Sequence, residues 1–286
     1  MAAVSGQVAL VTGAARGQGR SHALALAEAG ADIIAVDICA DVDTAPYPLA
    51  ESADLTTTAK EIEQIGRRVL AVECDVRSSA SLEDVVARGL SQFGRIDSLI
   101  ANAGIWALGN LWEITEAQWQ EMLDINLTGA WRSLKAVAPA MIEQKHGAIV
   151  LTSSVNGFEA GAGMGHYVAA KHGLLGLMKN AALELGRFNI RCNAVCPGIV
   201  DTNMNDWQGA YDMMAGHAGG TSEDRAYAAH NWSVLAGRGL LAPSSVSQAV
   251  VWLTSDDARD ITGVALPIDG GHAILPGSDP DPVRAL

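Results

Sequence analysis

The sequence predicts a doubly wound α/β fold, in which one parallel sheet carries helices on both faces. Three observations predict it: short β-branched runs recur along the chain, a helix-like segment separates each run from the next, and no composition shift marks a linker. Such alternation gives parallel strands with right-handed crossovers. The 286 residues are therefore expected to form one domain, residues 1–286, that buries a sizeable core.

Seven apolar runs are expected to be the strands of this sheet. In chain order they are Val8–Thr12, Asp32–Val36, Val69–Glu73, Ser98–Ala101, Ala148–Thr152, Ile190–Val195 and Val264–Pro267. Among the segments between them, Thr115 and Gln118 form a capping box that opens a long helix from Glu116 to His146. Pro139 inside that helix predicts a kink or a break near its end.

Three segments go beyond what the alternation requires. They are an insert at residues 38–53, a long segment at residues 203–241 and a Pro-rich tail at residues 276–286. We expect them to decorate the domain rather than to form a second one.

The composition excludes several classes of protein. Lysine and arginine number 19 and aspartate and glutamate 32, so the net charge is −13, and this field would repel nucleic acid. No signal-peptide pattern begins the chain, and the longest charge-free apolar stretch, residues 98–112, is too short to cross a membrane. We therefore expect a cytoplasmic protein.

Metal binding is not expected. The four cysteines form no CxxC pair, and they lie mostly in strand-like apolar surroundings, as reduced core thiols do. His22, His166 and His172 flank helices and have no carboxylate cluster nearby. Buried or solvated histidines are a better explanation than ligands.

A glycine-rich turn follows the first expected strand directly. It contains Gly13, Arg16, Gly17, Gln18 and Gly19, and an apolar helix-like run comes next. Glycines in such a turn let backbone amides approach a pyrophosphate, and the helix N-terminus adds positive potential. Strand, turn and helix together predict a dinucleotide site, whereas a glycine-rich turn alone would be an ordinary tight turn.

Asp37 indicates which dinucleotide binds. It ends the second strand, and its carboxylate can accept hydrogen bonds from both adenosine ribose hydroxyls while repelling a 2′-phosphate. This favours NAD over NADP. Arg16 points the other way, because its guanidinium could pair with a 2′-phosphate, although it could equally lie on the adenine.

A proton-transfer pair is predicted at Tyr167 and Lys171. Their i to i+4 spacing puts phenol and ammonium on one helix face. The ammonium, with the positive charge of an oxidised nicotinamide, is expected to lower the tyrosine pKa toward working pH. Ser154 follows the fifth strand, and its hydroxyl can donate to a substrate oxygen while Tyr167 exchanges the proton.

Separate motifs in this order and spacing resemble the short-chain dehydrogenase/reductase family over nearly the full length. They are TGxxxGxG at residues 12–19, Asp75–Val76, Asn102–Ala103–Gly104, Asn126, the Ser154/Tyr167/Lys171 set, Pro197–Gly198 with Thr202, and Asp269–Gly270–Gly271. The resemblance implies a single Rossmann domain with seven parallel strands in the order 3-2-1-4-5-6-7.

The resemblance also implies the roles of the site residues. Asn126, Ser154, Tyr167 and Lys171 would be the catalytic set, with Asn126 kinking its helix and holding a water for proton relay. The implied cofactor site comprises Gly13, Arg16, Gly17, Gln18, Gly19, Asp37, Ile38, Asp75, Val76, Asn102, Ala103, Gly104, Tyr167, Lys171, Pro197, Gly198, Val200 and Thr202. Asp75 and Val76 would hold the adenine, Lys171 the nicotinamide ribose, and Thr202 the carboxamide.

Two departures from the common family pattern resemble the carveol-dehydrogenase-like subgroup, many of whose members are called mycofactocin-coupled. They are Gln18 in the glycine turn and the acidic insert at residues 38–53. The resemblance implies NAD, a terpenoid-like alcohol, firmly held nicotinamide and a separate redox carrier. If the insert folds over the adenosine, Tyr47 and Leu49 would cover the base; otherwise it is a surface decoration.

The family places its substrate lid in residues 203–241. Trp207, Tyr211 and Met214 in this segment suit an apolar, adaptable pocket, although packing between helices would also explain about half of such residues. We expect Ser154, Trp106 and Met164 to complete the substrate site.

The expected activity is NAD-dependent interconversion of an apolar secondary alcohol and its ketone. One rival is an NADPH-dependent carbonyl or acyl-carrier reductase, and another is a catalytically silent dinucleotide-binding regulatory protein. The family's long helices, Glu116–His146 and His166–Leu185 here, imply a homotetramer, with Trp131 and Leu177 as candidate contacts.

Overall fold

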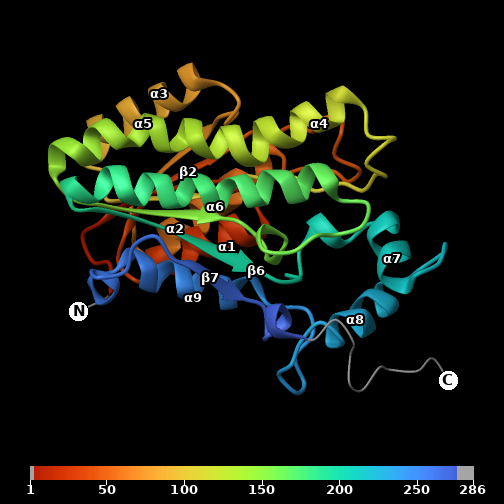
Figure 1. Ribbon diagram of the computed structural model, residues 1–286. Coiled ribbons are helices and arrows are strands. Elements are labelled where there is room, and N and C mark those ends of the chain that lie inside the picture. The colour runs from red at the N-terminus through yellow and green to blue at the C-terminus, as the bar shows by residue number, and fades with distance from the viewer. Residues whose placement is uncertain (1–2, 276–286) are drawn as a thin grey trace.

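Seven parallel strands form the centre of the protein, in the order β3-β2-β1-β4-β5-β6-β7 (Figure 1). The structure is a computed structural model that describes residues 3–275, so the expected tail at residues 276–286 lies outside the described residues. The strands are β1 Val8–Thr12, β2 Asp32–Asp37, β3 Val69–Glu73, β4 Ser98–Ala101, β5 Gly147–Thr152, β6 Ile190–Pro197 and β7 Ala265–Ile268. Fold class and strand order are as the sequence and the family resemblance predict.

The central strands are buried on both faces. Every residue of β1, β2, β4 and β5 is buried, which explains why these strands are continuous apolar runs rather than alternating ones. The edge strands β3 and β7 are partly exposed. Because Thr12 pairs in register with Val36, and Thr152 with Val195, the carboxyl ends of the strands meet along one edge of the sheet.

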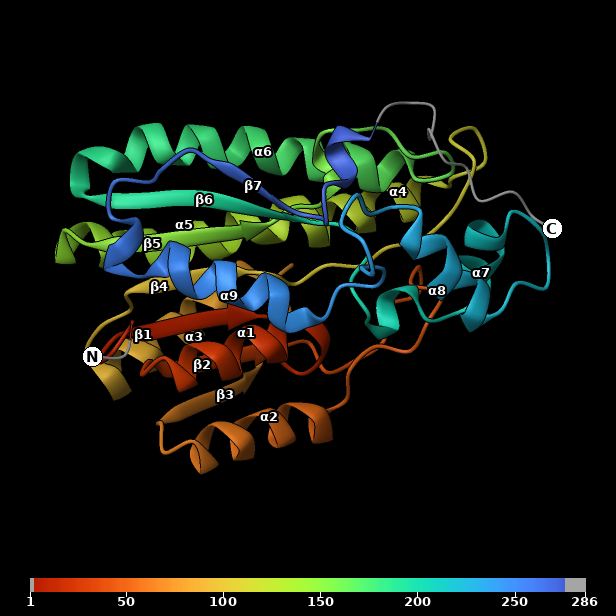
Figure 2. The same cartoon turned by 90° about the horizontal axis from the view of Figure 1, so that it is seen from below.

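Helices cover the two faces of the sheet, with α1, α2 and α9 on one face and α3, α5 and α6 on the other (Figure 2). The α-helices are α1 Gly17–Glu28, α2 Ser52–Gln64, α3 Ser79–Phe93, α4 Glu116–Leu123, α5 Gly129–Gln144, α6 Gly165–Leu185, α7 Gln208–Ala215, α8 Ser222–His230 and α9 Pro243–Thr254. A π-helical turn spans Asp124–Thr128, and short 3₁₀ turns span Val155–Gly157, Gly186–Phe188, Asn203–Asn205, Asp256–Ala258 and His272–Ile274.

The long helix expected from Glu116 to His146 is interrupted, but not at Pro139. The Asn126 side chain donates to the Met122 carbonyl at 3.0 Å within the π-helical turn, so a side chain enters the helical ladder there and widens it. Pro139 lies inside α5, which continues to Gln144 and ends where Lys145 takes a left-handed conformation. The helix therefore does not break at Pro139, and the kink that was the other expectation there stays a prediction.

The two internal additions lie at the carboxyl ends of the strands. Residues 38–51 run from β2 to α2 without regular structure. The insert is two residues shorter than expected, because Glu51 and Asp54 form a capping box that starts α2 at Ser52. Residues 203–241 contain α7 and α8, which project beyond the strand ends (Figure 2).

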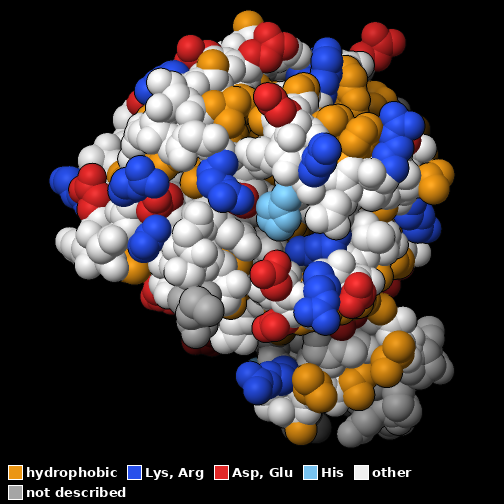
Figure 3. Space-filling model, turned by 90° about the vertical axis from the view of Figure 1, so that its left-hand side faces the viewer, with side chains coloured by type: hydrophobic (Ala, Val, Ile, Leu, Met, Phe, Trp, Pro, Cys, Tyr) orange, Lys and Arg blue, Asp and Glu red, His pale blue; other side chains and the backbone are white. Residues whose placement is uncertain are grey.

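Acidic and basic side chains are interspersed on the face at the left of Figure 1, which Figure 3 shows directly. No helix within residues 3–275 is long and apolar enough to cross a membrane.

Candidate active site

Two adjoining cavities open at the carboxyl edge of the sheet. The larger, here called the long cleft, has an empty volume of about 1080 Å³ including the part open to solvent, and it runs from Asp37 to Tyr167. The smaller, the side pocket, has about 660 Å³ and lies between Ser154 and the segment 203–241. Gln18, Ser153, Tyr167, Thr202 and Met204 line both. Tyr167 is thus placed where the cavities meet.

The structure brings the residues of the implied cofactor site together. The long cleft is lined by Gly13, Arg16, Gly17, Gln18, Gly19, Asp37, Ile38, Asp75, Val76, Asn102, Ala103, Gly104, Tyr167, Lys171 and Thr202. Pro197, Gly198 and Val200 line the side pocket instead.

The glycine turn is too tight to carry side chains. A Cβ on Gly19 would lie 1.8 Å from the Gly13 carbonyl oxygen, and Gly13 itself has a φ of +68°. The Thr12 hydroxyl accepts from the amides of Asn102 and Ala103, both at 3.0 Å, which ties the turn to the loop after β4. This bare backbone at a helix N-terminus is the surface that a diphosphate requires.

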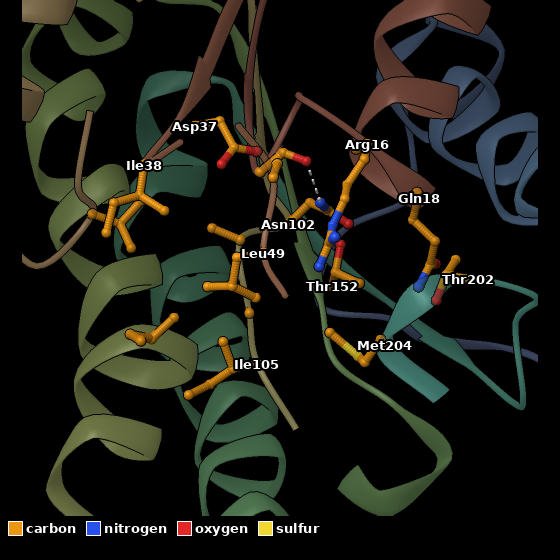
Figure 4. A pocket seen from close by; sticks show the side chains of 18 of the residues that line it. Arg16, Gln18, Asp37, Ile38, Leu49, Asn102, Ile105, Thr152, Thr202 and Met204 are labelled. Atoms are coloured by element: carbon orange, nitrogen blue, oxygen red, sulfur yellow. Dashed lines mark hydrogen bonds between the residues drawn. The ribbon is translucent and has the colours of Figure 1, made fainter. Parts of the chain in front are cut away.

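The Asp37 carboxylate is held at one end of the cleft by backbone amides. It accepts from Ala15 N at 3.0 Å and from Cys39 N at 3.2 Å, and only 8% of the residue is exposed. Arg16 extends into the cavity on the Thr152 side and away from Asp37 (Figure 4). Its guanidinium therefore lies away from the Asp37 carboxylate.

The insert is tied by a chain of polar contacts to Asp75, which lines the long cleft. Thr44 donates through its hydroxyl to Glu121 at 2.7 Å, and Arg77 pairs with Glu121 at 2.6 Å. Arg77 also pairs with Asp75 at 2.8 Å. Leu49 points into the cleft (Figure 4).

Tyr47, like Leu49, lines the long cleft, and coverage of the base by these two residues stays a prediction. The Tyr47 hydroxyl accepts from Trp106 N at 2.9 Å, and its ring lies 6.2 Å from that of Trp207. From the wall of the long cleft it therefore also reaches the loop after β4 and the segment 203–241. The neighbouring Pro46 and Pro48 are exposed and only Tyr47 is buried, so burial of the aromatic ring decided its direction.

Three expected catalytic residues lie where β5 ends and α6 begins: Ser154, Tyr167 and Lys171. Lys171 donates from Nζ to the Thr152 carbonyl at 2.9 Å, and this nitrogen lies 5.3 Å from the centre of the Tyr167 ring. The Ser153 hydroxyl donates to the Lys171 carbonyl at 2.9 Å, which fixes α6 against β5. The Tyr167 phenol is within hydrogen-bonding reach of Ser154.

Burial, not the ammonium, dominates the ionisation of the pair. Burial raises the pKa of Tyr167 to about 12, and this effect outweighs hydrogen bonding to Ser154, which lowers the pKa. Burial also lowers the pKa of Lys171 to about 8, so the ammonium is still the main form at neutral pH. The lowering expected from Lys171 together with the charge of an oxidised nicotinamide stays a prediction, and it would have to offset this effect of burial.

Asn126 lies behind the site rather than in the wall of either cavity. Its amide nitrogen donates to the carbonyls of Ile105 and Met122, both at 3.0 Å. Its buried oxygen has no hydrogen-bond partner among the described residues, and it would lie 2.6 Å from a Cβ on Gly104.

The side pocket contains most of the expected substrate residues. Trp106, Ser154, Met164 and Met214 line it. Trp207 packs on Trp106 from outside the pocket wall, and Tyr211 turns its hydroxyl to Asp206 instead. Met204 and Asn205 also line the pocket and were missed, although their position directly after Thr202 was an available signal.

One buried arginine fixes the segment 203–241. Arg225 contacts Asp201 at 3.1 Å, Asp206 at 3.4 Å and the Asn205 side-chain oxygen at 2.8 Å. Its side chain is 9% exposed. α8 is thereby held to the turn that carries Met204. Within residues 3–275 no cluster of histidine, cysteine and carboxylate side chains forms a metal site.

The long cleft fits a dinucleotide on its own geometry. The turn has no room for side chains, Asp37 lies at one end and Lys171 at the other, and the buried oxygens of Gln18 and Thr152 have no partner among the described residues. Such a cleft at the carboxyl edge of a doubly wound sheet is where this architecture binds nucleotides.

Comparison with known proteins agrees with this geometry. Residues 7–211 match the short chain dehydrogenase family. The chain is 44% identical to a (−)-trans-carveol dehydrogenase of Rhodococcus erythropolis, over 96% of this chain and all of the relative, and 45% identical to an NAD-dependent oxidoreductase of Mycobacterium tuberculosis, over 93% and 95%.

Among solved structures, the carveol dehydrogenase of Mycobacterium avium in complex with NAD superposes with a TM-score of 0.92 at 42% identity, covering 95% of this chain and 99% of the other. Family match, identity and coverage all extend over the glycine turn and the Ser154/Tyr167/Lys171 set. The protein belongs to the short-chain dehydrogenase family.

Proposed function

We propose that the protein is an NAD-dependent oxidoreductase that interconverts an apolar secondary alcohol and its ketone, with Tyr167 as the acid and base. The observation that carries the proposal is the position of Tyr167, which lines both the long cleft and the side pocket. A group there touches cofactor on one side and substrate on the other.

The residues of the long cleft would hold NAD. Backbone amides of the glycine turn would face the diphosphate, Asp37 the adenosine ribose, and Lys171 the second ribose. When bound, oxidised NAD accepts the hydride of the alcohol and adds a positive charge near the phenol. The anchored Asp37 and the direction of Arg16 support NAD over NADP.

The chain's own groups then manage one proton. With its pKa raised to about 12, Tyr167 is held as a phenol at neutral pH, which is the form that protonates a ketone oxygen during reduction. Alcohol oxidation requires the phenolate, so positive charge near the ring must offset the cost of burial. Lys171, charged below its pKa of about 8, supplies one such charge, and Ser154 holds the substrate oxygen.

The side pocket favours an apolar substrate. Trp106, Met164, Met204, Met213 and Met214 line it, and methionine adapts to irregular ligands. A terpenoid-like alcohol is consistent with the printed names of the carveol dehydrogenase relatives. Coupling to a separate redox carrier, such as mycofactocin, remains part of the proposal through the subgroup resemblance.

Replacement of Tyr167 by Phe tests the proposal. We expect kcat for oxidation of a cyclic secondary alcohol to fall at least about 100-fold, because only the transferable proton is removed. The NAD dissociation constant should change less than about twofold by calorimetry, since ring and packing remain. Tyr227→Phe, at a 52% exposed tyrosine of α8, is the matched control.

Two results would contradict this role for Tyr167. One is turnover above a few per cent of wild type in Tyr167→Phe. The other is an equal loss in Tyr227→Phe, which would trace the effect to general disruption.

We also propose a homotetramer, in which α5 and α6 pack across one two-fold axis and the last strand, β7, packs across another. The exposed fraction of Trp131 on α5 is 41%, and Leu177 on α6 is half-buried. Both apolar side chains are therefore available for contact with another copy of the chain. Light scattering at micromolar concentration should give four chain masses, and a monomer mass would refute the proposal.

A further inference from the structure

Tyr47 connects the insert to the substrate side of the molecule. It is 6% exposed and lies 59 residues from Trp106, whose backbone N–H donates to the Tyr47 hydroxyl at 2.9 Å. Its ring is tilted against that of Trp207, with centroids 6.2 Å apart. One side chain of the insert therefore touches both the loop after β4 and the segment 203–241.

The rings of Tyr47, Trp106 and Trp207 form what we call the aromatic wall. Trp106 and Trp207 meet edge to face with centroids 5.5 Å apart, a favourable arrangement. Trp106 donates from Nε1 to the Met164 sulfur and Trp207 to the Met204 carbonyl, both at 3.0 Å. Trp106, Met164 and Met204 line the side pocket, so the aromatic wall fixes where these three lining residues lie.

Several features hold Tyr47 in this place. Pro46 and Pro48 restrict the backbone on either side of Tyr47. Three residues before Tyr47, the Thr44 hydroxyl donates a hydrogen bond to Glu121. Val42 is also buried in the core. The ring is thus presented by a constrained segment rather than by a free loop, and it loses little entropy when it packs.

Resting on the proposed function, we propose that Tyr47 is a positioning residue for the substrate. It holds Trp106 and Trp207 so that the side pocket accepts apolar secondary alcohols of limited size. The insert then serves both cavities: Leu49 and Tyr47 line the long cleft, and the Tyr47 ring also supports the side pocket through Trp106 and Trp207. Tyr47 lines the long cleft but not the side pocket, so its effect on the alcohol would pass through the two tryptophans.

The test compares Tyr47→Ala and Tyr47→Phe with wild type at saturating NAD, using cyclic secondary alcohols of increasing ring size. For Tyr47→Ala we expect KM for the best alcohol to rise about tenfold, with kcat within about twofold, and the preference against larger rings to shrink. Tyr47→Phe keeps the ring and should recover most of the selectivity. Asp43→Ala, at an exposed residue of the same insert, is the control.

A double-mutant cycle locates the effect. If Tyr47 acts through Trp207, the double variant Tyr47→Ala/Trp207→Ala should be little worse than Trp207→Ala alone. Additive losses would overturn the proposal. So would a Tyr47→Ala variant that changes only NAD affinity and leaves the alcohol KM within twofold of wild type.

A readout without substrate keeps the test independent of the proposed function. Limited proteolysis of the NAD-loaded protein should cut residues 203–241 at least about threefold faster in Tyr47→Ala than in wild type, because Trp207 loses a contact. If wild type oxidises no alcohol of the set but this difference appears, the proposed function fails and the positioning role stands. Equal cleavage rates would overturn the positioning role.

Discussion

The two edges of the sheet treat their polar groups differently. At the amino edge, Asp97 is fully buried and accepts from Val8 N at 2.8 Å and from the Arg95 guanidinium. Asp32 accepts from Arg67 at 2.7 Å and from the Arg68 backbone N–H at 3.0 Å. These carboxylates join strand starts and helix ends within the chain.

At the carboxyl edge, polar groups are left facing the cavities. The Gln18 and Thr152 side-chain oxygens are buried without a partner among the described residues. Asp37 is anchored by two amides, yet it lines the long cleft. At the amino edge, the carboxylates of Asp32 and Asp97 thus stabilise the fold. At the carboxyl edge, polar side chains face a cavity that a ligand could occupy, as expected for a doubly wound sheet.

Loss of the Asp97 carboxylate should give the largest effect and should fall on stability. Asp97→Ala leaves Val8 N buried without an acceptor and removes the partner of Arg95, so we expect the free energy of unfolding to drop by about 3 kcal/mol. Urea denaturation measures it. The NAD dissociation constant should stay within about twofold.

The control for Asp97 is Asp84→Ala, which removes an exposed carboxylate that pairs with Arg88 on one helix. It should cost less than about 0.5 kcal/mol. A comparable loss in both variants would remove the distinction between the two edges.

Replacement of Asp37 should affect recognition instead. Asp37→Ala removes both hydrogen bonds to the ribose and the repulsion of a 2′-phosphate, so the ratio of kcat/KM for NAD over NADP should fall about 100-fold, about 2.7 kcal/mol. Its stability cost should be well below that of Asp97→Ala.

Asp37→Asn sharpens this test because it keeps a hydrogen-bond acceptor and loses the charge. An intermediate ratio is expected for it. An unchanged ratio in Asp37→Ala would show that the carboxylate does not select the cofactor.

Replacement of the insert should give the smallest effect, on cofactor release. Residues 41–50 are exchanged for a short Gly-Ser turn, and Glu51 is kept because it caps α2. With the contacts of Thr44 and Leu49 gone, the NADH off-rate should rise at least about tenfold, about 1.4 kcal/mol on the barrier. Stopped-flow displacement measures it, and equal off-rates would leave the insert a surface decoration.

Local pattern was enough to predict the elements that lie near one another in sequence. The continuous apolar runs gave β1 and β4, which are buried on both faces, and the edge strand β3 with the expected bounds. The approach of Tyr167 to Lys171 followed from helical spacing alone.

Features that depend on contacts between distant segments could not be predicted from the local sequence pattern. Whether Pro139 breaks a helix depends on the packing around it, and the irregularity arose instead at Asn126, where a side chain bonds to the backbone. The direction of Tyr47 depends on two tryptophans from other segments. The tyrosine pKa depends on burial, which no spacing between residues reveals.

The sequence by itself therefore determined the strand content, the glycine turn and the identity of the Ser154/Tyr167/Lys171 set. The strands and the turn rest on periodicity or on neighbouring residue types, and the set rests on spacings of four and thirteen residues together with the family resemblance. Only the tertiary structure decided which side chains share a cavity, how far each is removed from water, and that Tyr47 of the insert contacts Trp106 and Trp207. Those properties depend on distances between segments and on the dielectric around each group, and both are set when the chain packs.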